Sequence, residues 1–224
     1  MAENQKIFLL IGDSGSGKTS SMRNMPLEKT ALLNTEQKTM LPFKGANRLY
    51  KHGSISNVDT FLPALDKLIE DEKVEYIVLD SLSFLLNMFE MQKVRTATNT
   101  MKAWGDYGDF YKQIIHKIKS SKKNFVIMVH PKDVYDEKTM MMKTTAFSKG
   151  SNSGFIEADF NVVVYTDVSI GEDELPRYRF LVKKTKETIG KSVKSPFDMF
   201  KTPYTESNDI MEVFAAIDEY IKND

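Results

Sequence analysis

Short, continuously apolar runs alternate with longer amphipathic stretches along this chain. Such runs predict buried strands, because a strand covered on both faces carries apolar side chains at most positions. They occupy residues 6–11, 30–34, 74–80 and 124–130, with a weaker run at 48–52. The amphipathic stretches have apolar residues three or four positions apart, which is typical of helices with one buried face. They cover residues 57–69, 83–95, 104–118 and 208–221.

The alternation of strands and helices predicts an α/β fold with a mostly parallel central sheet and helices on both faces. Two later strands, at residues 161–166 and 177–183, are joined by an acidic turn that contains Gly171 and Pro176. This turn predicts an antiparallel C-terminal strand pair.

Three segments lack a helical or strand period and are expected to be loops. They are residues 38–47, the Lys-, Thr- and Met-rich residues 132–159, and the basic residues 184–196. Pro26 is expected to end the first helix. No repeat or linker divides the sequence, so residues 1–224 are expected to form a single domain.

Amino-acid composition and charge limit the classes of function that this chain can have. The chain has 224 residues with 41% hydrophobic residues, and its 31 basic and 31 acidic residues give no net charge. Any basic surface must therefore be local. The absence of cysteine excludes disulfides and thiolate metal sites, and fits a cytoplasmic location. We expect no signal peptide, because residues 1–5 have no basic n-region and the apolar run after them is short. We expect no membrane segment, because no run approaches the ~20 apolar residues of a membrane span.

A glycine-rich segment follows the first apolar run directly. Residues 12–19 read G-D-S-G-S-G-K-T and match G-x-x-x-x-G-K-[ST], the phosphate-binding P-loop. The strand before the motif and the polar start of a helix at residues 19–23 are the context that the motif requires. The alternative is a Gly/Ser surface turn, which would not need that context.

The spacing of the P-loop has a physical cause. Glycines carry no Cβ and tolerate positive φ, so the chain can wrap its N–H groups around phosphate oxygens. The helix that follows adds unpaired N–H groups and a positive dipole end. Lys18 is expected to reach the β- and γ-phosphates, and Thr19 to place its hydroxyl on Mg²⁺. The predicted cofactors are ATP and Mg²⁺, and the predicted nucleotide contacts are Gly12, Asp13, Ser14, Gly15, Ser16, Gly17, Lys18, Thr19 and Ser20.

Asp80 is the second candidate metal ligand, because it ends the apolar run over residues 74–80. An aspartate at the tip of an apolar strand, after a P-loop, is the Walker B arrangement that holds Mg²⁺ with the P-loop hydroxyl. The carboxyl ends of strands line the ligand crevice in a doubly wound sheet, so Asp80 and Thr19 are expected to meet there. Alternatively, Asp80 caps the helix that follows, because aspartate is a favoured N-cap residue.

Two further polar residues follow core strands. Glu36 comes after the strand at 30–34 and could orient or deprotonate the water that attacks the γ-phosphorus; alternatively, it is a solvated loop residue. His130 ends the run over 124–130 and could sense the γ-phosphate through a hydrogen bond. It could equally be a buried histidine satisfied by a backbone carbonyl.

The segment over residues 132–159 mixes lysines with aromatic residues. They are Lys132, Lys138, Lys143 and Lys149, interleaved with Tyr135, Phe147 and Phe155. Such a loop could contact a phosphate backbone and stack the bases of single-stranded nucleic acid, although lysines are also common in mobile surface loops. The stripe of Trp104, Tyr107 and Tyr111 at helical spacing is expected to be core.

In their order along the chain, these parts resemble the core of RecA-like ATPases. The order is the P-loop, Glu36, V-L-D-S at residues 78–81, His130 and a late basic strand end. In particular, the chain is similar to compact bacteriophage P-loop ATPases that are related to RecA and linked to single-strand annealing and recombination. The resemblance covers most of residues 6–203 and is strongest at the P-loop and Walker B. It implies a RecA-like P-loop NTPase fold.

The resemblance also implies roles for individual residues. In RecA-like enzymes a glutamate in the place of Glu36 activates the water, and a polar residue in the place of His130 relays the γ-phosphate state to a DNA-binding loop. RecA itself uses an amide at that second position. RecA also supplies two lysines, one residue apart, from the neighbouring subunit, and Lys184 and Lys186 have this spacing. They would neutralise transition-state charge across an interface; alternatively, they belong to a solvated basic loop.

The predicted function is therefore ATP hydrolysis coupled to single-stranded DNA binding in phage recombination or replication, in the host cytoplasm. A homo-oligomer, ring-like or filament-like, is expected because Lys184 and Lys186 would act in trans. RecA's N-terminal oligomerisation helix and C-terminal domain have no counterpart in this sequence, so a filament is not implied and a ring or a looser assembly is equally open. Two alternatives stay open. One is a nucleotide-gated switch that binds a protein partner and hydrolyses weakly. The other is a small-substrate nucleotide kinase.

Overall fold

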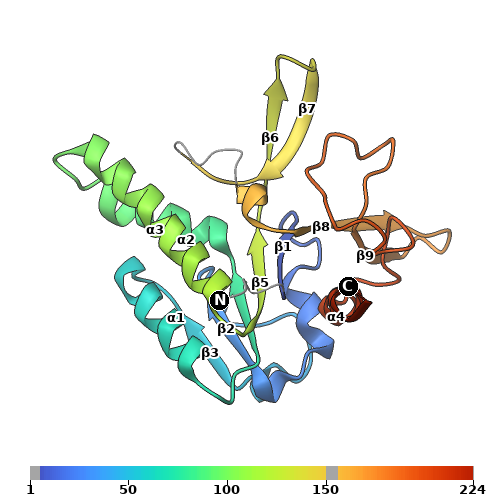
Figure 1. Cartoon of the computed structure of the whole chain (residues 1–224), viewed down its shortest axis with the longest axis horizontal. Coiled ribbons are helices and arrows are strands. Elements are labelled where there is room, and N and C mark those ends of the chain that lie inside the picture. The colour runs from blue at the N-terminus through green and yellow to red at the C-terminus, as the bar shows by residue number, and fades with distance from the viewer. Residues whose placement is uncertain (1–5, 150–155, 224) are drawn as a thin grey trace.

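A central twisted sheet organises the protein in a computed structural model, which describes residues 6–149 and 156–223 (Figure 1). Within those residues the sheet has seven strands in the order β3-β2-β4-β5-β1-β8-β9. The strands are β1 Ile7–Ile11, β2 Thr30–Asn34, β3 Lys51–Ser54, β4 Tyr76–Asp80, β5 Asn124–Val129, β8 Val162–Ile170 and β9 Pro176–Leu181. All neighbours from β3 to β8 pair in parallel, and β9 is antiparallel to β8. The predicted fold class, including the C-terminal antiparallel pair, is confirmed.

Four α-helices cover the sheet in the described part of the chain. They are α1 Phe61–Glu70, α2 Leu82–Phe89, α3 Thr100–Ser120 and α4 Ile210–Asn223. Each lies on a predicted amphipathic stretch, but a single turn of 3-10 helix, Val58–Thr60, precedes α1, and a π-helical turn, Glu90–Val94, extends α2. The side chain of Asn57 accepts a backbone N–H at the start of the 3-10 turn before α1, and that of Asn99 does so at the start of α3. These caps explain why helical structure begins there.

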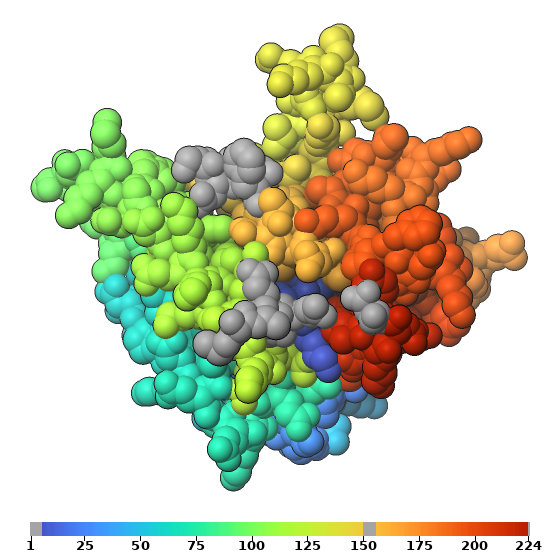
Figure 2. Space-filling view, viewed as in Figure 1, coloured from blue at the N-terminus to red at the C-terminus, as the bar shows by residue number. Residues whose placement is uncertain are grey.

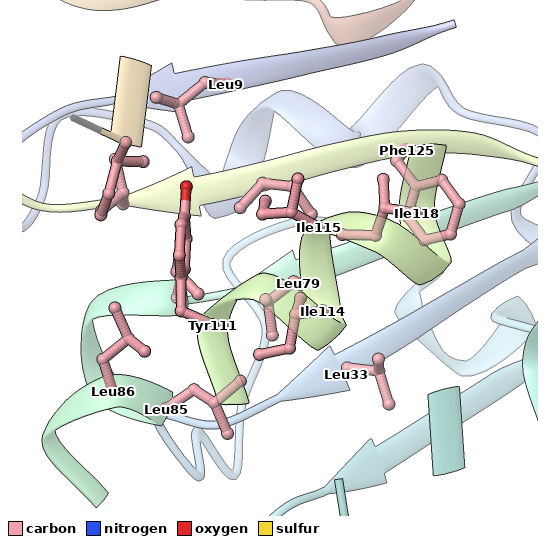
Figure 3. Close-up of a cluster of buried hydrophobic side chains, with 14 of the residues drawn as sticks. Leu9, Leu33, Leu79, Leu85, Leu86, Tyr111, Ile114, Ile115, Ile118 and Phe125 are labelled. Atoms are coloured by element: carbon pink, nitrogen blue, oxygen red, sulfur yellow. The ribbon is translucent and has the colours of Figure 1, made fainter. Parts of the chain in front are cut away.

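Two apolar layers bury the sheet, one on each face. Alternate residues of a strand point to opposite faces, so Leu9 packs toward α1, α2 and α3 whereas Phe8 packs toward α4. Figure 3 shows the first layer, where Ile114, Ile115 and Ile118 of α3 lie against the sheet. Tyr107 and Tyr111 belong to this layer too, so the prediction that they are core residues is confirmed; Trp104 is partly buried and packs against the layer.

The segment after the P-loop is a 3-10 helix, Thr19–Asn24, and not the start of an α-helix. Side chains favour this tighter winding, because Ser20 and Ser21 both donate to carbonyls three residues earlier. The helix also ends before Pro26, since Met25 is extended as the residue before a proline tends to be.

The prediction that residues 132–159 form a loop is largely wrong. It contains a β-hairpin, β6 Pro131–Asp136 and β7 Met141–Ala146, and a 3-10 helix, Ile156–Asp159. The hairpin projects from the body of the protein as the yellow knob in Figure 2. Most of its side chains are exposed on both faces, so its sequence has no alternation of apolar and polar residues from which strands could be predicted.

The packing of α4 generates a stability prediction. Phe214 is 3% exposed and meets the rings of Phe8 and Tyr76 edge-on at 5.2 and 5.4 Å between centroids. We expect Phe214→Ala to lower the free energy of unfolding by about 3–5 kcal/mol in chemical denaturation. Glu219→Ala, on the exposed face of α4, is the control and should change it by less than about 0.5 kcal/mol. Equal effects of the two substitutions would contradict this account of the layer.

Candidate functional site

The carboxyl ends of four neighbouring strands meet around one cleft. The P-loop follows β1, Glu36 follows β2, Asp80 ends β4 and His130 follows β5. The cleft has a volume of about 290 Å³. Its lining includes Ser14, Gly15, Gly17, Lys18, Thr19, Ser20, Glu36, Lys38, Met40, Pro42 and His130. Most of the predicted site residues therefore lie together, as parallel strands require.

The P-loop backbone is shaped by its glycines. Gly15 and Gly17 have φ values of 78° and 93°, a region that L side chains rarely adopt. Gly12 is required for a different reason, since a Cβ there would lie 2.0 Å from Oγ1 of Thr166 on β8. The loop is further tied to β8 because Thr166 donates to Ser16 Oγ at 2.8 Å.

Lys18 is buried beneath the loop. Its ammonium donates to the carbonyls of Gly12 and Asp13 at 2.7 and 2.9 Å, so the side chain already spans the cradle. Burial lowers the pKa of Lys18, and the carboxylates of Asp80 and Glu36 partly oppose this shift. A phosphate in the cradle would give this desolvated ammonium an anionic partner.

Thr19 and Asp80 meet at the floor of the cleft although 61 residues separate them. The Thr19 hydroxyl donates to Asp80 Oδ2 at 2.7 Å, and Asp80 is 1% exposed. The other oxygen of Asp80 has no hydrogen-bond partner among the described residues. Asp80 does not act as the N-cap of α2, since Ser81 occupies that position and the Asp80 carboxylate faces Thr19 instead.

This pair fits a magnesium ion. The Thr19 hydroxyl can offer a lone pair to the metal while it donates to Asp80 Oδ2 at 2.7 Å, and the Asp80 carboxylate can accept hydrogen bonds from metal-bound water. Within residues 6–149 and 156–223 there is no group of three or more His, Asp or Glu side chains that could hold a metal alone. Mg²⁺ suits this arrangement, because it commonly takes one or two protein ligands and completes its shell with phosphates and water.

Glu36 and His130 face each other across the cleft. Their Oε1 and Nε2 atoms lie 3.7 Å apart, and both Glu36 Oε1 and His130 Nδ1 lack a hydrogen bond in the described part of the chain. Burial favours a raised pKa for Glu36, but the hydrogen bond and charge of Lys38 outweigh it, so the pKa is lowered. Burial and the charge of Lys18 lower the pKa of His130. At neutral pH the site therefore holds a carboxylate beside a neutral imidazole.

Lys38 is the charged residue of the cleft lining that sequence analysis missed. Its ammonium lies 2.8 Å from Thr19 Oγ1, 3.0 Å from Asp80 Oδ2 and 2.8 Å from Glu36 Oε2. Burial opposes the charge of Lys38, but Asp80 and Glu36 outweigh this and raise its pKa. A signal was present in the sequence, because Lys38 follows Glu36 by two residues at the same sheet edge.

The other lysines for which the sequence suggested a function lie outside the cleft. Lys184 and Lys186 are exposed and do not line the cleft among the described residues. In the hairpin region, Lys143 pairs with Asp136, and Lys149 pairs with Glu90. Phe155 lies outside the described residues.

A family model described as an AAA domain matches residues 4–199. The chain belongs to this AAA domain family, and the match supports the class of P-loop, nucleotide-binding ATPases that the cleft also indicates. No curated protein matches the chain. Among the described helices, none combines the length and the apolar character needed to cross a membrane.

The buried imidazole generates a pH prediction. His130 takes up a proton less readily in the folded chain than in the unfolded chain, so acidification through about pH 6.5 should favour unfolding. We expect His130→Gln to remove this contribution, so that its Tm falls less than that of the wild type between pH 7.5 and 5.5, a window placed around the histidine value of ~6.5. His116→Gln, at an exposed position of α3, is the matched control and should keep the wild-type dependence. Parallel Tm profiles for all three proteins would contradict the assignment.

Proposed function

We propose that this protein binds ATP·Mg²⁺ in the cleft and hydrolyses the terminal phosphate. The observation that carries the proposal is the hydrogen bond from Thr19 to Asp80, which joins the P-loop to the acidic end of β4. Thr19, and Asp80 through water, would hold Mg²⁺, which neutralises phosphate charge when bound. Residues Gly12 to Ser20 would cradle the phosphates, with Lys18 against the β- and γ-phosphates.

Glu36 is proposed to position the attacking water. It lines the cleft, and its lowered pKa keeps it as a hydrogen-bond acceptor at neutral pH. One of its oxygens is held by Lys38, while Oε1 is buried and has no hydrogen bond among the described residues, so it is an unused acceptor that a water admitted beside it would satisfy. The short distance to His130 makes this pair sensitive to whatever occupies the γ-phosphate position.

His130 is proposed to transmit the nucleotide state to the β6–β7 hairpin. It is directly followed by Pro131, the first residue of β6, and its carbonyl accepts the N–H of Phe147, just after β7, at 2.8 Å. On the other side, Ser83 of α2 accepts the His130 N–H at 2.8 Å. Movement of His130 would therefore be felt at the base of the hairpin.

Single-stranded DNA is the partner we propose for the hairpin, in a recombination or replication role. Support comes from its position next to His130, and from Tyr135, which is 52% exposed and could stack a base. Lys132 and Lys138 would contact phosphates.

A protein partner is the second candidate, and the hairpin itself favours it. Residues 131–146 contain three lysines and three acidic residues, so their net charge is zero. The exposed apolar side chains of the hairpin suit protein contact, because methionine adapts to different surfaces. They are Val134, Tyr135, Met140, Met141 and Met142.

Lys184 and Lys186 are proposed to complete a neighbouring subunit's site. Both are exposed and neither lines the cleft of its own chain, which suits a contribution in trans, where cations stabilise transition-state charge. The assembly would then be a homo-oligomer, and turnover would rise with protein concentration.

Substituting Glu36 tests its proposed role with water. We expect Glu36→Gln to reduce the ATP hydrolysis rate by roughly 100-fold or more, because an amide cannot accept the proton of the attacking water. Nucleotide binding, measured by fluorescence anisotropy of a labelled ATP analogue, should be retained. Glu28→Gln, an exposed position away from the cleft, should leave both unchanged. A normal hydrolysis rate for Glu36→Gln would mean that another residue positions the attacking water.

The partner is tested by measuring ATP turnover with and without single-stranded DNA over a range of protein concentrations. We expect DNA to stimulate turnover, turnover per chain to rise with concentration, and Lys184→Ala/Lys186→Ala to abolish that rise. Tight ATP binding with little turnover, unaffected by DNA, would contradict the DNA proposal and favour the protein-binding switch. A concentration-independent rate would contradict the trans lysines.

A further inference from the structure

Lys38 sits where three oxygens of the cleft converge. Its ammonium contacts Thr19 Oγ1, Asp80 Oδ2 and Glu36 Oε2 at 2.8, 3.0 and 2.8 Å. All three oxygens act as acceptors toward it, and two of them come from the residues proposed to hold Mg²⁺. The ammonium is therefore a cation in the place that the site offers to a metal.

The hydrogen bonds of Thr19 define that place. A hydroxyl has one proton, and Thr19 donates it to Asp80 at 2.7 Å. Its lone pairs must then face an electron-poor group, and Lys38 meets one of them at 2.8 Å. A divalent ion on the other lone pair would lie about 4 Å from the ammonium, so charge repulsion opposes binding of both cations at once.

The backbone of Lys38 is held while its side chain is long and flexible. Asn34, which is 1% exposed, accepts the Lys38 N–H at 3.2 Å and donates to the Lys38 carbonyl at 2.9 Å. The Lys38 side chain itself is 30% exposed and reaches the cluster from the mouth of the cleft. The ammonium can therefore leave by rotation about side-chain bonds, with no movement of β2.

We propose that Lys38 is a built-in competitor for the divalent cation. In the nucleotide-free protein it joins Thr19, Asp80 and Glu36 and keeps free metal out; it gives way only when the metal arrives with a nucleotide, whose phosphates offer the displaced ammonium new partners. This inference rests on the proposed metal–nucleotide site. It assigns to Lys38 a role in the order of loading, distinct from the roles of Lys18 and Glu36.

The test measures metal binding without nucleotide. Mn²⁺ binding to the full-length chain is followed by electron paramagnetic resonance, and Tm is recorded in EDTA and in excess Mg²⁺. We expect Lys38→Met to bind Mn²⁺ roughly tenfold more tightly than the wild type or more, because a positive charge beside the site is gone. In EDTA its Tm should be lower by roughly 5 °C, since Asp80 and Glu36 lose their counter-charge, and Mg²⁺ should restore it.

Three further variants make the result specific. Lys44→Met, an exposed lysine of the same segment, should behave as the wild type. Lys38→Gln keeps a hydrogen-bond donor without the charge, so it should fold and show the same gain in Mn²⁺ affinity even if Lys38→Met does not fold. Lys38→Met/Asp80→Asn should lose the gain, because the carboxylate that faces the metal is removed.

The outcomes separate this inference from the proposed function. If the wild type binds a labelled ATP analogue in a Mg²⁺-dependent way, but the Mn²⁺ affinities of wild type and Lys38→Gln are equal, Lys38 is no competitor and the inference is overturned alone. A metal-dependent gain that persists in Lys38→Met/Asp80→Asn overturns it as well. Absence of any Mg²⁺-dependent nucleotide binding by the wild type overturns the proposed function and this inference with it.

Discussion

The structure depends on keeping a balanced set of charges at the buried edge of one sheet. Asp80 is almost completely buried, and Glu36 is largely buried beside it. Two ammonium groups, those of Lys18 and Lys38, balance the charge of these two carboxylates. An unpaired charge in such a place costs several kcal/mol, so each group constrains the conformation of the others. The ion pairs within the cleft therefore fix the relative positions of its charged side chains.

Sheet topology creates this arrangement. The strand order places β5 between β1 and β4, so His130 enters between the P-loop and the acidic end of β4. Parallel pairing also brings four carboxyl ends to one edge, although the residues they carry are far apart along the chain. The apolar layers on both faces hold the strands in this register, which is why distances near 3 Å between side chains of different strands can be maintained.

Much of the fold and site could be predicted, and the reasons for success and failure are physical. Buried strands and amphipathic helices have strong patterns, and Gly12, Lys18 and Asp80 sit at the motif spacings, so these were predictable. The hairpin was not, because both of its faces are solvated and the apolar alternation is absent. The 3-10 helix after the P-loop arises from serine side chains competing for nearby carbonyls, an effect that periodicity does not record. The role of Lys38 depends on a three-dimensional convergence of oxygens.

A continuous series of contacts joins the cleft to the hairpin. His130 is anchored on one side by Ser83 at the start of α2 and on the other by Phe147 just after β7, while its ring faces Glu36. Lys38 lies on the opposite side of Glu36, at 2.8 Å from the second carboxylate oxygen. A cation exchange at Thr19 and Asp80 would therefore change what Glu36 binds, and through Glu36 the surroundings of the His130 ring. Coupling between the proposed metal position and the hairpin would need only side-chain rearrangements at the edge of the sheet, because each step joins groups less than 4 Å apart.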